Sequence, residues 1–199
     1  MQNFMRISTV DVLPLMIHIK QRPELWTEDT FLRHYPQGPF ADVESIMLRF
    51  PKIADFSTCK PHIAERKLAA YKANTLAGYD QHESINRPAW GILTEAHNIV
   101  YALMATVRGD RLGRVMINKI RPGGKIFPHS DTPEHTRYYR RYHVCLQSQP
   151  GVVFRAGDEQ VYMAPGEVYW FDNRQEHEVI NNSADDRIHL IIDIHRDGL

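Results

Sequence analysis

The sequence predicts an α+β fold in which a β-barrel or jelly roll carries helices on one face. The half after Gly109 consists of short extended stretches separated by turn residues, such as Pro122-Gly123-Gly124 and Pro165-Gly166. Many short strands with turns between them are typical of barrels and jelly rolls. The half before Gly109 shows helical periodicity instead, with Ile92, Ala96 and Ile99 as one example.

The N-terminal part, residues 1–110, is predicted to be mainly helical. Its clearest helix lies between Pro88, which suits a helix start, and Gly109, which suits the position after a helix end. Apolar residues between these two recur every three or four positions. The elements expected here are an amphipathic helix that begins at residue 13, a helix at 61–74, a helix at 88–107 and one strand at 44–50.

The C-terminal part, residues 111–199, is predicted to be a β-rich core. No repeat, low-complexity segment or linker separates it from the helical part, so we expect one domain over residues 1–199. Residues 172–176 are predicted to be a polar connection. The strands expected are 114–120, 142–146, 152–155, 160–163, 167–171 and 187–195.

Composition excludes several classes of partner. Lys plus Arg and Asp plus Glu both number 24, so no basic excess indicates nucleic-acid binding. No run of about 18 apolar residues predicts a membrane span, and the first ten residues lack the features of a signal peptide. The two cysteines, Cys59 and Cys145, are far apart, so we expect no disulfide framework. A reducing cytoplasm is the expected location.

Two histidines and a carboxylate in the C-terminal part form a candidate metal site. His129 and Asp131 are two residues apart, and on an extended segment such residues project to the same side. His177 follows several strands later. Two histidines and one carboxylate form the facial triad of non-haem Fe(II) oxygenases, which leaves coordination positions open.

A candidate ligand for a carboxylate follows ten residues after His177. Arg187 begins the last predicted strand, and its guanidinium can pair bidentately with the distal carboxylate of 2-oxoglutarate. Each feature alone has an ordinary structural explanation: an HxD spacing occurs by chance, Asp131 before Thr132-Pro133 can open a turn, and Arg187 can be an edge charge. Their joint occurrence, in this order and within a strand-rich half, favours the metal site.

The alternation of polar and apolar residues concerns the same site. Around residues 141–146, Arg141 and His143 share one strand face. In a soluble sheet the polar face normally contacts water, whereas in a ligand-holding barrel it can line the cavity. We expect Arg141 and His143 to face the cavity and His195, near the chain end, to face solvent. Trp170 and Phe171 are expected in the core.

These residues resemble the aspartyl/asparaginyl β-hydroxylase family, over roughly residues 116–195. The resemblance implies a double-stranded β-helix, a cupin-like jelly-roll barrel, and an Fe(II)-dependent dioxygenase with 2-oxoglutarate and O2 as co-substrates. The segments that carry it are Arg121–Asp131, Arg141–Val144, Pro165–Asp172, Glu176–Ser183 and Arg187–Asp193.

Carried over by position, the family's iron-binding histidines fall on His129 and His177. The oxo-acid-binding arginine falls on Arg187, and the Arg-x-His element that helps to hold the same co-substrate falls on Arg141 and His143. A polar strand residue that touches the co-substrate falls on Asn118. The vertebrate enzymes lack a carboxylate two residues after the first histidine, whereas this chain has Asp131 there, as bacterial free-proline hydroxylases do. This difference favours a three-ligand site and argues against direct transfer of the EGF-domain substrate.

The resemblance implies hydroxylation of an amino-acid carbon, either in a free amino acid or in an Asp- or Asn-type residue of a protein. Between the metal ligands, the cationic and aromatic residues 137–140 could hold a carboxylate-bearing substrate or form a solvated loop. Two other functions stay open. One is a cupin-like protein that binds a metal or ligand without turnover, and the other is a three-histidine dioxygenase that uses His143 and needs no 2-oxoglutarate.

Overall fold

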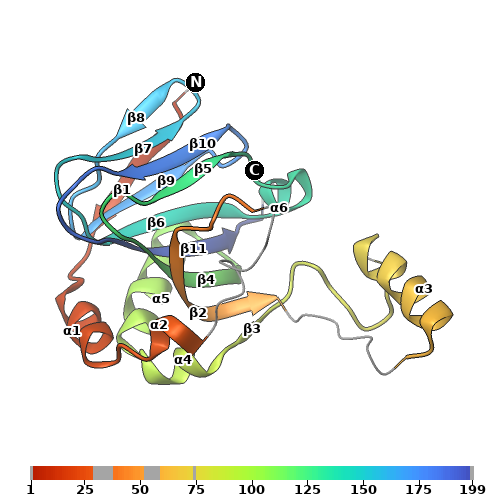
Figure 1. Ribbon diagram of the computed structural model, residues 1–199. Coiled ribbons are helices and arrows are strands. Elements are labelled where there is room, and N and C mark those ends of the chain that lie inside the picture. The colour runs from red at the N-terminus through yellow and green to blue at the C-terminus, as the bar shows by residue number, and fades with distance from the viewer. Residues whose placement is uncertain (1, 29–37, 52–58, 74, 198–199) are drawn as a thin grey trace.

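Two antiparallel sheets face each other in the computed structural model, which describes residues 2–28, 38–51, 59–73 and 75–197 (Figure 1). The large sheet has the order β1-β9-β6-β11-β4-β2-β3, and the small sheet has the order β5-β10-β7-β8. The strands of the large sheet are β1 (Phe4–Thr9), β2 (Val43–Pro51), β3 (Ser84–Asn86), β4 (Arg111–Ile120), β6 (Arg140–Gln147), β9 (Glu167–Phe171) and β11 (Arg187–His195). Those of the small sheet are β5 (Lys125–His129), β7 (Val152–Ala156), β8 (Glu159–Val161) and β10 (His177–Asn181).

The helices of the N-terminal part cover the outer face of the large sheet (Figure 1). They bury an extensive apolar core against it, which includes Leu15, Leu93, Val100, Ile117 and Leu190. The predicted jelly-roll fold with helices on one face is therefore confirmed. The covering helices are α1 (Leu13–Gln21), α2 (Leu25–Glu28), α4 (Pro88–Ile92) and α5 (Glu95–Val107); α3 (Pro61–Lys72) stands away from them, and α6 (Pro133–Tyr138) precedes β6.

Strand β11 explains why the last segment alternates between apolar and polar residues. Ile188, Leu190 and Ile192 face the helices and join their core. The other face carries Arg187, His189 and Asp193, which are all buried as well. The polar face of this strand is therefore the inside of the jelly roll, because the helices already occupy the outside.

The predicted helix 88–107 is wrong in one respect, because it is divided into α4 and α5. Leu93 adopts φ −88° and ψ 63°, which is not helical, and its side chain is fully buried. His97 bridges the break, with its Nε2 2.9 Å from the Trp90 carbonyl oxygen and its ring stacked on the Trp90 ring. The chain thus interrupts the helix where this bend places Leu93 in the core.

Several elements were not expected from the sequence. Strand β1 pairs with β9 at the edge of the large sheet, β3 pairs with β2, and β5 and β10 pair in the small sheet. The N-terminal part is consequently less helical than predicted, because it contributes three strands to the large sheet. These pairings depend on distant partners, so local sequence patterns do not reveal them.

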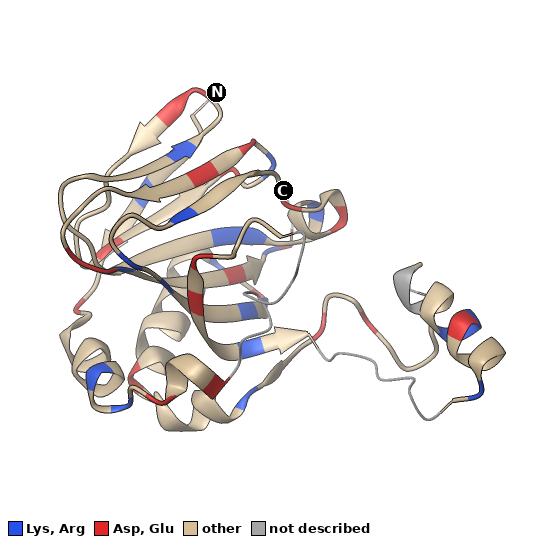
Figure 2. Ribbon diagram, viewed as in Figure 1, with Lys and Arg blue, Asp and Glu red and all other residues tan. Residues whose placement is uncertain are grey.

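Charged residues of both signs are interspersed along the sheets and helices (Figure 2). Some form ion pairs on the surface, such as Arg155 with Glu176 and Glu178. Within the described ranges, no helix has the length and apolar character needed to cross a bilayer.

Candidate metal centre

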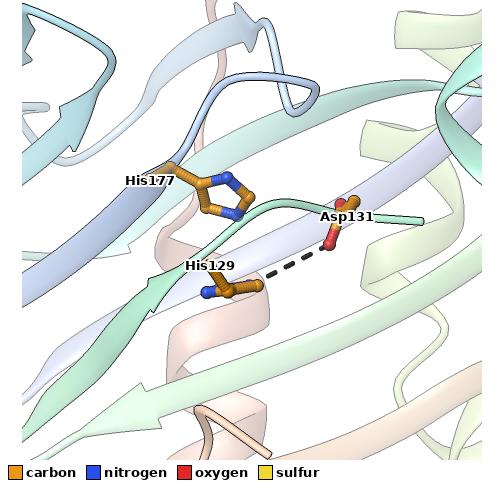
Figure 3. A group of neighbouring side chains, drawn as sticks. All are labelled: His129, Asp131 and His177. Atoms are coloured by element: carbon orange, nitrogen blue, oxygen red, sulfur yellow. Dashed lines mark ion pairs between the residues drawn. The ribbon is translucent and has the colours of Figure 1, made fainter. Parts of the chain in front are cut away.

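His129 and His177 occupy directly opposed positions on neighbouring strands. His129 ends β5 and His177 begins β10, and the two residues are paired in the register of these strands. Their ring centroids are 4.2 Å apart. Asp131 follows on the same chain segment as His129, and its backbone N–H donates to the Asn173 carbonyl oxygen at 3.2 Å. Potential ligand atoms of His129, Asp131 and His177 lie within 4.8 Å of one another (Figure 3).

The Nδ1 atoms of both histidines are already engaged. His129 Nδ1 lies 2.8 Å from the Phe127 carbonyl oxygen, and His177 Nδ1 lies 2.9 Å from that of Gln175. An N–H that donates to a carbonyl fixes the tautomer and leaves Nε2 unprotonated, which is the form that binds a metal. Both Nε2 atoms are therefore available to a metal ion.

Hydrogen bonds from the protein also fix the orientation of the Asp131 carboxylate. Its Oδ2 accepts hydrogen bonds from Arg141 Nη1 at 2.5 Å and from Asn173 Nδ2 at 2.7 Å. Its Oδ1 lies 3.9 Å from His129 Nε2 and has no such donor among the described residues (Figure 3). One carboxylate oxygen is thus held by the protein while the other faces the two imidazoles.

The protonation states at the site suit metal binding. Burial lowers the pKa of His177 to about 4, so its imidazole is neutral at pH 7. Burial by itself raises the pKa of Asp131, but the Arg141 guanidinium, His177 and the Asn173 amide more than offset this and hold the pKa below its usual value. Neutral imidazole and ionised carboxylate are the ligating forms of these groups.

Arg141 lines the cavity, but two protein carboxylates engage its guanidinium. Besides its bond to Asp131, it donates from Nε and Nη2 to the two oxygens of Asp193, at 2.7 and 2.9 Å. His135 Nε2 lies 2.8 Å from the same Asp193. Burial raises the pKa of Asp193, yet Arg141 and His135 hold it well below its usual range. The contribution of Arg141 to co-substrate binding stays a prediction, because its donors in this structure face carboxylates.

Arg187, unlike Arg141, has no carboxylate partner among the described residues. Its side chain is fully buried, and its Nε and Nη1 have no hydrogen-bond partner. Its Nη2 lies 3.0 Å from His189 Nδ1, which in turn is 3.4 Å from His143 Nδ1, and its guanidinium carbon is 5.7 Å from the Phe154 ring centroid. Burial lowers the pKa of Arg187 to about 10, and no described carboxylate compensates.

The predicted cavity residues come together on the inner faces of both sheets. His143 and Asn118 both line the cavity, and the Asn118 Oδ1 accepts a hydrogen bond from Ser45 Oγ at 2.8 Å. His195 does not line the cavity, and its Nδ1 lies 2.5 Å from Asp110 Oδ1. The cavity is lined by Phe40, Phe50, Arg114, Met116, Asn118, Ile126, His129, Asp131, Arg141, His143, Phe154, Phe171, His177, Val179 and Ile191.

Residues 137–140, between the ligands, do not belong to this lining within the described part of the chain. Tyr138 instead stacks between the rings of His82 and His195, and Tyr139 is buried against Gly113. Phe171 is a core residue, as expected, and it also borders the cavity. Trp170 is partly buried against the helix-side core.

Sequence comparison supplies the family. The sequence profile of the aspartyl/asparaginyl beta-hydroxylase family matches residues 51–197, which is most of the chain and extends beyond the segments that suggested the resemblance. The chain belongs to this family. This aspartyl/asparaginyl β-hydroxylase family member gives no match among curated proteins by sequence.

A solved structure that aligns over nearly the whole chain supports the fold of this family member. An oxidoreductase of the 2OG-Fe(II) oxygenase family from Burkholderia pseudomallei has a TM-score of 0.51 and 13% identity, over 96% of this chain and 93% of that one. A cupin domain from Bordetella pertussis has a TM-score of 0.35 and 20% identity, over 44% of this chain and 85% of that one. A predicted oxalate decarboxylase from Thermotoga maritima has a TM-score of 0.36 and 17% identity, over 52% of this chain and 74% of that one.

Three side chains near the site, those of Asn173, Asp193 and His135, were not singled out from the sequence. Asn173 and Arg141 hold Asp131, while Asp193 and His135 hold Arg141. Asp193 lies on the polar face of the last strand, which was the available indication. Asn173 lies in a connection and His135 in the short helix α6, where no periodicity identifies an inward side chain.

Proposed function

We propose that this protein is an Fe(II)- and 2-oxoglutarate-dependent oxygenase that hydroxylates an amino-acid carbon, in a free amino acid or in an Asp- or Asn-type residue of a protein. The donor set supports this proposal. Two imidazoles and one carboxylate lie within reach of a single ion, and this is the ligand set of non-haem Fe(II) oxygenases. The protein would hold iron through His129, Asp131 and His177.

The observation that carries the proposal is the unpaired guanidinium of Arg187. A fully buried charge without a counter-charge is costly, and such groups are normally paired. Arg187 lies on the inner face of β11, next to Phe154 and in contact with His189, on the same side of the sheet as the metal-binding residues. A carboxylate bound there would satisfy its free Nε and Nη1. 2-Oxoglutarate carries such a carboxylate at the end opposite its chelating oxo-acid group.

The remaining residues of the cavity bind, orient or exclude water. Arg141 and Asn173 keep one oxygen of Asp131 occupied, so the other stays directed at the metal position. His143 and Asn118 are the further residues that we propose for holding the co-substrate. Bound iron, together with 2-oxoglutarate and O2, supplies the oxidising power to hydroxylate an unactivated C–H bond.

Neither alternative is favoured by a specific contact. In a three-histidine site, His143 would join His129 and His177, but the His143 Nδ1 faces His189 and the described cluster of ligand atoms contains Asp131 instead. A cupin-like protein that binds a carboxylate without turnover would use Arg187 in the same way, so succinate formation is the measurement that separates it from an oxygenase. Oxygenase chemistry accounts for both features at once.

The first experiment measures succinate. Purified protein is loaded anaerobically with Fe(II) and then supplied with 2-oxoglutarate and O2, alongside His177→Ala and Arg187→Gln. We expect succinate from the wild type and none above background from either variant. Fe(II)-dependent binding of 2-oxoglutarate is measured in parallel by calorimetry, because turnover without the prime substrate can be slow. Absence of both succinate and this binding would overturn the proposal.

A further inference from the structure

A second arginine, Arg114, is also without a counter-ion among the described residues. Arg114 lies on β4, lines the same cavity as the metal-binding residues, and packs over the Phe50 ring with its guanidinium carbon 5.4 Å from the ring centroid. Its Nε is buried without a hydrogen-bond partner. No hydrogen bond or ion pair joins Arg114 to any residue in the described part of the chain. Burial lowers its pKa, which Asp193 at longer range opposes only in part.

Arg114 cannot pair with the nearest carboxylate as the site is built. Asp193 belongs to the neighbouring strand β11, but both of its oxygens already accept from Arg141, and one also contacts His135. Asp131 is engaged by Arg141 and Asn173 on one oxygen and faces the imidazoles with the other. Neither of these two carboxylates is therefore paired with the Arg114 guanidinium.

Arg114 and Arg187 lie at opposite ends of one ladder. Arg187 pairs in register with Ile120 on β4, and Arg114 lies six residues before Ile120 on that strand. At about 3.3 Å per residue, the two positions are roughly 20 Å apart along the strand. 2-Oxoglutarate is much shorter than this distance, so the carboxylate that pairs with Arg187 cannot also pair with Arg114.

The surroundings of Arg114 are apolar. Met47, Phe50, Met116 and Ile191 form a hydrophobic cluster separate from the two larger cores. Three of these residues, Phe50, Met116 and Ile191, line the same cavity as Arg114 and the metal-binding side chains. A ligand in this part of the cavity would therefore contact hydrocarbon along its length and a guanidinium at its end.

The balance of charge indicates the same kind of ligand. Arg114 and Arg141 line the cavity, Arg187 lies against its wall at Phe154, and the carboxylates that act on Arg114 and Arg141 are Asp131 and Asp193. One positive charge is left in excess. Under the proposed function, Fe(II) adds two positive charges and 2-oxoglutarate two negative ones, so the excess remains. A ligand carboxylate at Arg114 would pair with the guanidinium that is left over.

We propose that Arg114 binds a carboxylate of the substrate, whose apolar carbons lie against Met116 and Ile191 and face the metal. The substrate is then a carboxylic acid with an aliphatic portion, such as an amino acid with a free α-carboxylate, and not a neutral amide. That the bound acid is a substrate rests on the proposed function, whereas the anion subsite itself rests on Arg114 alone.

The subsite is tested by NMR on the metal-free protein. The Nε–Hε signals of Arg114 and Arg187 are assigned by their loss in Arg114→Gln and Arg187→Gln. We expect 3-methylbutanoate to shift the Arg114 signal in a saturable way, and the neutral isostere 3-methylbutanamide to leave it in place. No saturable shift with the acid, or an equal shift with the amide, would overturn the subsite.

A separate arm of the same experiment tests the proposed function. Zn(II), which does not support turnover, is added with 2-oxoglutarate, and the Arg187 signal is followed. A shift at Arg187 supports the oxygenase, and its absence counts against the oxygenase without affecting the acid titration at Arg114. If 2-oxoglutarate shifts Arg114 and leaves Arg187 unchanged, the assignment of the two subsites is wrong.

Kinetics then connects the subsite to the substrate. Amino acids and their carboxamides are screened for stimulation of succinate formation, and we expect only the acids to stimulate it. Arg114→Gln should raise KM for the stimulating acid roughly tenfold to a hundredfold, the value of a charged hydrogen bond, with KM for 2-oxoglutarate unchanged. Arg111→Gln, on the same strand but paired with Asp80 outside the cavity, is the matched control and should change neither. Equal use of acid and carboxamide by the wild type would contradict the inference.

Discussion

Arg141 and Asp193 form a forked ion pair in the interior, with Nε to Oδ1 at 2.7 Å and Nη2 to Oδ2 at 2.9 Å. The third guanidinium nitrogen of Arg141 donates to Asp131, the candidate metal ligand. Asp193 therefore acts on the metal position through Arg141, although it does not face that position itself. Charge-assisted, bidentate contacts of this kind fix geometry as well as contributing energy.

Asp193→Asn should loosen this arrangement while it leaves the three ligands in place. It removes one partner of a buried ion pair, so we expect a loss of about 3–5 kcal/mol in the free energy of unfolding. Metal affinity should fall roughly tenfold to a hundredfold, as for other groups that orient a ligand indirectly. Urea unfolding and competitive metal titration measure the two effects. Asp185→Asn, at an exposed position outside both groups of potential metal ligands, is the control, and unchanged metal affinity in Asp193→Asn would contradict the role.

Arg187→Met should have opposite effects on stability and on binding. The metal-free, ligand-free protein buries an unpaired guanidinium at this position, so an apolar side chain of similar length should raise the free energy of unfolding by roughly 1–4 kcal/mol. The same variant should lose the stabilisation that 2-oxoglutarate and metal give to the wild type. Unfolding in urea with and without these ligands measures both. If Arg187→Met without ligands is less stable than the wild type without ligands, Arg187 has a structural partner.

The chemistry of the site could be predicted from the sequence better than its geometry. His129, Asp131 and His177 could be proposed because a facial triad needs only residue types, order and spacing, and the strand pairing places the two histidines opposite each other. The pairing of the buried arginines could not be predicted from the sequence. Whether Arg187 and Arg141 find carboxylates depends on side chains that are distant in the chain, and here one is paired and the other is not.

The fold shows the same distinction. Turn residues and alternation identified most strands of the C-terminal part, and apolar spacing identified the helices, although Leu93 divides one of them. Strand β1 carries no strong local pattern, with its six residues ranging from buried to exposed. It exists because β9 offers a free edge, which is a property of the assembled sheet and not of the segment.

His143 and His189 should make the metal-free protein sensitive to acid. Burial, and then the positive charge of Arg187, lowers the pKa of both imidazoles well below 6.5. The unfolded chain protonates them as the pH falls below about 6.5, whereas the folded protein does not, so the free energy of unfolding falls as the pH decreases. At pH 5 the unfolded-state pKa of about 6.5 limits this loss to at most about 2 kcal/mol for each histidine.

His189→Gln tests this pH dependence, because the amide oxygen can still accept from Arg187 but does not titrate. Between pH 7.5 and pH 5, we expect the variant to lose roughly 2 kcal/mol less stability than the wild type. Urea unfolding at both pH values gives the difference. His62→Gln, at an exposed position of α3, should follow the wild type. Parallel pH profiles for His189→Gln and the wild type would refute the buried, neutral state of His189.

Metal binding should raise the free energy of unfolding. A ligand that binds only the folded state at a hundred times its Kd stabilises it by about 2.7 kcal/mol. For a chain of this size, that corresponds to a rise in Tm of roughly 5–10 °C when Fe(II) or Zn(II) is added under anaerobic conditions. His177→Ala should abolish the rise and Asp131→Asn should reduce it, because each removes a ligand atom from the cluster. His62→Ala leaves the cluster intact and should keep the full rise. The exposed group Asp110, His195 and Asp197 is a second place where a metal could bind, so an unaltered rise in His177→Ala would place the ion there and reject the triad as the metal centre.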